Sequence, residues 1–158
     1  MFDQIFGLPA HPLIIHLAVM VTPLLAVLAI GYVVLPRFRQ KLDWAVVLSA
    51  LAAPVSVFAA QESGDALKER LFHGQTPAAV AAHEEFADPL LFVTLGLTVV
   101  TLVLVYVTRT RRDPGAAASS SARAVTLVLS AATVLLALVV GYYVVRTGHS
   151  GATAVWAA

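Results

Sequence analysis

Four long apolar segments, separated by polar connections, dominate the pattern along the chain. They are residues 12–35, 42–61, 89–108 and 124–145, and Asp43 is the only charged residue within them. A helix of roughly 20 residues crosses the hydrocarbon core of a bilayer. Helices are favoured there because backbone polar groups in lipid must be paired within the segment. We therefore predict an all-α integral membrane four-helix bundle, with residues 1–158 as a single transmembrane domain.

The composition supports this prediction and limits the chemistry. The chain is 59% hydrophobic and only 12% charged, whereas a soluble domain has about 25% charged residues. The formal net charge of +1 gives no indication of a nucleic-acid partner, and the expected surroundings are the lipid membrane. Because the chain has no cysteine, disulfides and thiolate metal sites are excluded.

The basic residues indicate how the bundle is oriented. Seven of the ten Lys and Arg residues lie in the connections after the first and third segments: Arg37, Arg39, Lys41, Arg109, Arg111, Arg112 and Arg123. The positive-inside rule places these connections in the cytoplasm. Both termini and the loop 62–88 are then expected on the outer side. Within that loop Thr76 and Pro77 predict a helix start, so we expect helical extensions above the membrane.

The chain also contains a weak internal repeat. The first helical hairpin enters with His11 and His16 and leaves at the Ser63-Gly64 pair. The second enters with His83 and leaves at the Ser150-Gly151 pair. We expect two parallel repeats about an axis along the membrane normal, an arrangement that places sites at the repeat interface.

The histidines are the candidate ligands. All five map to the predicted outer side, and imidazole can bind haem iron, zinc or copper. His16 lies inside the first segment, where polar groups usually face the bundle interior. We predict that it converges with His83 and His149 at the outer rim, where Glu62 would complete a four-helix ring. His11 is five residues from His16, about 140° around a helix, so the pair cannot chelate one ion from a regular helix.

Several motifs resemble those of a known family. They are "GLPAHPLIIHLAVMVTPL", "SGDAL", "AAHEEFADPL" and "TGHSGATAVW". The chain resembles the bacterial domain of unknown function numbered twenty-two thirty-one, a group of small four-helix membrane proteins. This resemblance implies a multi-pass protein of the bacterial inner (plasma) membrane. The layout is also similar to that of membrane b-type cytochromes, which implies axial roles among His16, His83 and His149.

These observations leave two functional hypotheses open. The first is a site near the outer face that binds b-type haem for electron transfer, through His16, His83 and His149, or a transition-metal ion such as copper, iron or zinc. The candidate metal ligands are His11, His16, Glu62, Asp65, His83 and His149. The second is a non-catalytic membrane subunit or scaffold without a cofactor. Either form could belong to a homodimer or to a larger redox membrane complex. The GxSxG, P-loop, GxGxxG and HExxH motifs do not occur, and no reaction is assigned.

Overall fold

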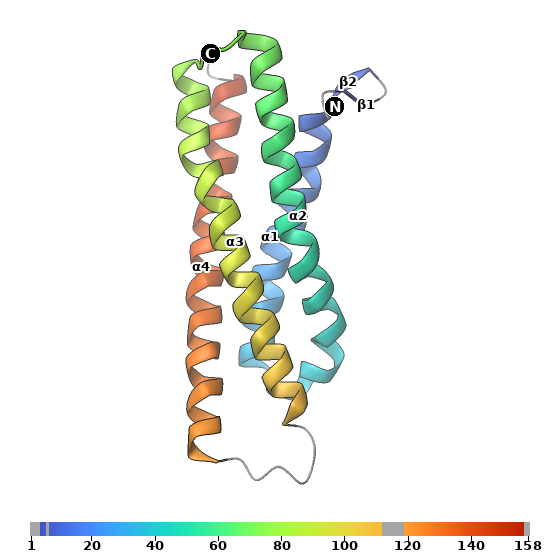
Figure 1. Ribbon diagram of the computed structural model, residues 1–158, viewed down its shortest axis with the longest axis vertical. Coiled ribbons are helices and arrows are strands. Elements are labelled where there is room, and N and C mark those ends of the chain that lie inside the picture. Colours follow the sequence, from blue (N-terminus) through green and yellow to red (C-terminus); the bar gives the residue numbers. More distant parts are fainter. Residues whose placement is uncertain (1–3, 6, 112–118, 157–158) are drawn as a thin grey trace.

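A computed structural model describes residues 4–5, 7–111 and 119–156 of the chain. It contains four long helices and a two-residue antiparallel strand pair (Figure 1). The elements are β1 (Gln4–Ile5), β2 (Leu8–Pro9), α1 (Ala10–Val34), the short 3-10 helix η1 (Pro36–Phe38), α2 (Arg39–Phe72), α3 (Ala78–Thr110) and α4 (Ser120–Trp156). Of the basic residues discussed above, Arg112 lies outside the described residues.

The all-α membrane prediction is confirmed. Each of the four helices is long and apolar enough to cross a membrane. The predicted segments coincide with them, apart from Leu35, which follows the end of α1. The helical extensions are also confirmed, since α2 continues to Phe72 and α3 begins at Ala78, directly after Pro77. The β1–β2 pair was not predicted; its register joins Gln4 to Pro9 and Ile5 to Leu8.

The bundle consists of two helical hairpins, α1–α2 and α3–α4. Helix α1 packs mainly on α2 and α4, and α3 packs on α4 and α2, so that α1 and α3 are diagonal. The beginning of α1, the end of α4 and the α2–α3 connection lie at the same end of the bundle (Figure 1). We call this the histidine end, because it carries His11 and His83, and we call the opposite end the basic end.

The internal repeat is present in the burial pattern. A shift of 72 residues relates six buried positions of α1 to six buried positions of α3. The α1 positions are Ala18, Thr22, Leu25, Ala26, Ala29 and Tyr32, and the α3 positions are Leu90, Thr94, Leu97, Thr98, Thr101 and Leu104. A shift of 87 residues likewise relates Val46, Ala50 and Ala53 of α2 to Thr133, Ala137 and Val140 of α4. The two hairpins therefore turn equivalent faces toward each other, as the sequence repeat predicted.

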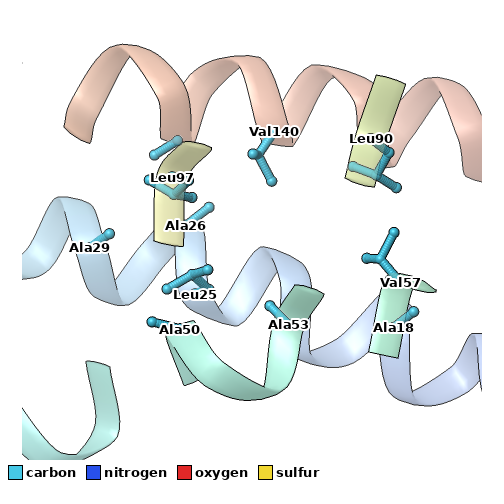
Figure 2. Close-up of a cluster of buried hydrophobic side chains, with 11 residues drawn as sticks. Ala18, Leu25, Ala26, Ala29, Ala50, Ala53, Val57, Leu90, Leu97 and Val140 are labelled. Atoms are coloured by element: carbon cyan, nitrogen blue, oxygen red, sulfur yellow. The ribbon is translucent and has the colours of Figure 1, made fainter. Parts of the chain in front are cut away.

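The core between the hairpins is built mostly from small and aliphatic side chains. Figure 2 shows alanines of α1 and α2 in this cluster, with Leu90 and Leu97 of α3 and Val140 of α4 opposite them. Small side chains let helix backbones approach closely, which is a main source of helix association in lipid.

A proline inside α2 leaves one backbone carbonyl without its usual helical donor, and a side chain of α3 donates to it instead. Pro54 has no backbone N–H, so the carbonyl of Ala50 lacks its usual donor four residues later. The hydroxyl of Thr98 donates to this oxygen at 2.9 Å. The hydrogen bond satisfies a polar group that lipid could not satisfy and joins the two hairpins.

At the basic end a buried polar network joins α1, α2 and α3. Tyr32 donates from its hydroxyl to Asp43 at 3.0 Å, and it hydrogen-bonds Thr108 at 2.7 Å. Nε of Arg109 donates to the other carboxylate oxygen of Asp43 at 3.0 Å. Asp43, the one charge in the predicted segments, is thus paired where it is buried. Leu104 and Ser130 occupy the positions equivalent to Tyr32 and Asp43, so this network breaks the repeat symmetry.

Candidate functional site

His11 lies in the first turn of α1, against the extension of α2. Its Nδ1 is 2.9 Å from the carbonyl oxygen of Ala60 and 3.1 Å from Oγ of Ser63. Ser63 is 1% exposed, and its hydroxyl donates to the same Ala60 carbonyl at 2.9 Å. The ring is therefore held by a carbonyl and a hydroxyl that are themselves hydrogen-bonded.

His83 repeats this arrangement in the second hairpin, where α3 meets α4. Its Nδ1 is 3.1 Å from the carbonyl oxygen of Thr147 and 3.2 Å from Oγ of Ser150. The Ser150 hydroxyl donates to the Thr147 carbonyl at 3.1 Å. His83 and Ser150 are shifted by 72 and 87 residues from His11 and Ser63, which are the shifts that relate the two halves of the core.

A glycine completes each arrangement. A Cβ added to Gly64 would lie 3.1 Å from Cε1 of His11, and one added to Gly151 would lie 3.1 Å from Cε1 of His83. These contacts are closer than ordinary van der Waals separation, so each imidazole needs a neighbour without a side chain. We call the two sets His11–Ser63–Gly64 and His83–Ser150–Gly151 the His–Ser–Gly units.

The hydrogen bonds determine the tautomer of both rings. A carbonyl oxygen can only accept, so Nδ1 must carry the proton in each neutral imidazole. Nε2 is then the unprotonated nitrogen, and in neither ring does it have a hydrogen-bond partner among the described residues. The units thus present two lone pairs from diagonal helices.

The structure does not bring together the residues expected to form the site. His16 was predicted to face the interior, and this is wrong: its side chain is exposed and hydrogen-bonds the Pro12 carbonyl of its own helix. His11 faces α2, and a separation of five residues turns His16 away from it by about 140°. His149 is exposed beside the second unit. Among the described residues no three His, Cys, Asp or Glu side chains cluster closely enough to hold a metal, so the expected convergence of His16, His83 and His149 is not found.

The remaining candidates lie on the surface of the histidine end. Glu62 and Asp65 are exposed, and Asp65 pairs with Lys68 at 3.2 Å. His73 is exposed and adopts a left-handed backbone conformation directly after α2, as expected for a turn.

Polar contacts between α2 and α3 hold the two hairpins together at this end. Nε2 of Gln61 donates to the Ala87 carbonyl at 2.8 Å, and Nζ of Lys68 donates to Glu84 at 2.6 Å. The hydrogen bond with Glu84, assisted by Asp65, raises the pKa of Lys68 above its usual value. These contacts restrain α2 relative to α3, and therefore the first His–Ser–Gly unit relative to the second.

The comparison with protein families agrees with the membrane architecture. The model of the DUF2231 family, described as a predicted membrane protein, matches residues 7–158. The chain belongs to this family. The match includes both His–Ser–Gly units, so the DUF2231 region and the repeated bundle are the same part of the chain. No curated protein and no solved structure matches the chain, and the resemblance to b-type cytochromes has no support from these comparisons.

Proposed function

We propose that this DUF2231 protein binds b-type haem at the histidine end and transfers single electrons, and that Nε2 of His11 and Nε2 of His83 would hold the haem iron. The observation that carries the proposal is the equivalent pair of imidazoles whose Nδ1–H groups are held and whose Nε2 atoms have no hydrogen-bond partner among the described residues. Metal-bound histidines usually donate their other N–H to a carbonyl, carboxylate or water, which fixes the tautomer and the ring orientation.

The number of donors favours haem over a bare ion. Protein zinc sites use three or four ligands, whereas the described residues offer no group of three suitable side chains. Haem brings four nitrogens of its own and needs only axial ligands from the protein. We therefore propose His11 and His83 as the haem ligands, in place of the set of His16, His83 and His149. A copper, iron or zinc ion is the less supported form of the proposal.

Haem, when bound, supplies the one-electron couple of its iron. The contribution of the chain is to hold the two imidazoles. Each imidazole is positioned by a serine and a carbonyl, which keep its Nε2 unprotonated and fix the orientation of the ring. These groups are Ser63 and the Ala60 carbonyl for His11, and Ser150 and the Thr147 carbonyl for His83. Because basic residues mark the cytoplasmic side, the proposal places the histidine end on the extracytoplasmic face of the bacterial inner membrane. Electrons would be exchanged there with a partner in a redox membrane complex.

The proposal is tested with the full chain purified in detergent from haem-supplemented cells. We expect a reduced-minus-oxidised spectrum of low-spin, bis-imidazole haem, and restoration of this spectrum when hemin is added to haem-free protein. His11→Ala and His83→Ala should each abolish it, whereas His16→Ala and His73→Ala should leave it unchanged. Ser63→Ala should weaken hemin binding by roughly 10-fold or more, the effect typical of residues that support a ligand.

Two results contradict the haem proposal. One is wild-type protein that folds and takes up no hemin. The other is a haem spectrum that survives in both the His11→Ala and His83→Ala variants. In the first case a protein without a cofactor, acting as a membrane subunit or scaffold, becomes the better interpretation.

A further inference from the structure

Two threonines in the core of the bundle have buried hydroxyls that find no hydrogen-bond partner among the residues the structure describes. Thr22 of α1 is 1% exposed and Thr94 of α3 is 0% exposed. Neither Oγ1 atom has a hydrogen bond to any described residue, not even to a carbonyl of its own helix. A buried hydroxyl without a partner is unfavourable, and in native proteins such groups usually bind an ordered water molecule.

These two hydroxyls are equivalent in the repeat. Thr22 follows His11 by eleven residues, and Thr94 follows His83 by eleven residues. This is about three helical turns, or roughly 16 Å along the axis. Both threonines therefore face the interior between the hairpins, at the same depth below the two His–Ser–Gly units.

The buried neighbours of Thr22 on its own face of α1 are small. Ala18 and Ala26 are the neighbours of Thr22 on the same face of α1, one turn away in each direction, and both are buried. Ala50 and Ala53 of α2 belong to the same buried cluster (Figure 2). A buried water needs two to four polar partners, and the two hydroxyls are such partners.

We propose that Thr22 and Thr94 bind internal water at the centre of the bundle, on its approximate two-fold axis, and that this water links the two hairpins. The Thr101 hydroxyl, which is also buried and has no hydrogen-bond partner in the described part of the chain, extends the hydrated region two turns along α3 toward the basic end. This proposal concerns the middle of the bundle and does not depend on haem binding.

The direct test is water-edited solid-state NMR of the wild-type chain in lipid bilayers. We expect magnetisation to pass quickly from water to the side chains of Thr22 and Thr94. Thr133 is the internal control: it is equally buried, but its hydroxyl donates to the Leu129 carbonyl of its own helix at 2.8 Å. Transfer to Thr22 and Thr94 that is no faster than transfer to Thr133 overturns the proposal.

A matched set of variants gives a second test. If water links the hydroxyls, the Thr22→Val/Thr94→Val double variant should unfold at a lower temperature than Thr133→Val. If the hydroxyls are dry and unpaired, valine removes two unsatisfied groups, and the double variant should unfold at a higher temperature than the control. Hemin binding is measured on the same variants, and its outcome tests the haem proposal independently of these two tests of internal water.

Discussion

Replacing Gly151 by alanine tests whether the second His–Ser–Gly unit is as tightly built as its distances indicate. The added Cβ would lie 3.1 Å from Cε1 and 3.2 Å from Nδ1 of His83. The ring cannot yield freely, because the same Nδ1 is bound to the Thr147 carbonyl and the Ser150 hydroxyl. Gly148, three residues earlier in α4, is the matched control, since a Cβ there would meet nothing within 4 Å.

The expected free energies of unfolding follow from these contacts. Alanine in place of a helical glycine gains up to about 1 kcal/mol in helix propensity, and Gly148→Ala should show this gain. In Gly151→Ala, overpacking against the ring costs about 1–3 kcal/mol, and weakening a ring hydrogen bond costs about 1 kcal/mol. Because both variants share the propensity gain, Gly151→Ala should be less stable than Gly148→Ala by roughly 2–4 kcal/mol.

Thermal unfolding in one detergent, followed by circular dichroism, measures this difference. Gly64→Ala should behave as Gly151→Ala does, because the Cβ would lie equally close to His11. If Gly151→Ala is as stable as Gly148→Ala, the imidazole is not held where the structure has it, and the reasoning about the units is refuted.

Three further predictions concern the contacts that join the hairpins. Thr98→Val should lower the free energy of unfolding by about 1–3 kcal/mol, because it leaves the Ala50 carbonyl unpaired. In a Pro54→Ala background the same substitution should cost less, because the amide restored at position 54 can donate to the Ala50 carbonyl. Equal losses in the wild-type and Pro54→Ala backgrounds would contradict this. Asp43→Asn should cost roughly 1–3 kcal/mol, since it weakens the hydrogen bonds from Tyr32 and Arg109, and a denaturation midpoint like that of the wild type would count against the network. The ion pair of Lys68 should contribute at most about 1 kcal/mol to the free energy of unfolding. This contribution should be complete below the ordinary lysine pKa of about 10.4 and lost as pH rises through the raised pKa of Lys68. A stability difference between wild type and Lys68→Met that grows at alkaline pH would contradict this.

Sequence patterns predicted the helices and the repeat because lipid imposes simple requirements. Uninterrupted apolar length identified every span, and Thr76-Pro77 located the start of α3 to within one residue. The paired Ser-Gly motifs indicated the repeat, because a serine and a glycine at equivalent positions of α2 and α4 receive the two histidine rings. These signals are local, so they can be found without knowing how the helices pack.

The choice of ligand could not be predicted in the same way. His16 lies further inside the first apolar segment than His11, and this position suggested that its side chain faces the interior of the bundle. Which face of α1 turns inward is decided by its packing on α2 and α4, and that packing directs Ala18, Thr22 and Leu25 to the core. His11 lies on the side that meets Ser63 and Gly64, while His16 is left on the outer face of the helix.

The tautomer of His11 and His83 is the most direct test of the account, and nitrogen-15 NMR of histidine-labelled, haem-free protein in bilayers can measure it. We predict that both rings, when neutral, carry their proton on Nδ1 and have an unprotonated Nε2, with closely similar nitrogen-15 shifts for the two residues. Protonation at Nε2 in both rings, or a mixture of the two tautomers, would contradict this prediction.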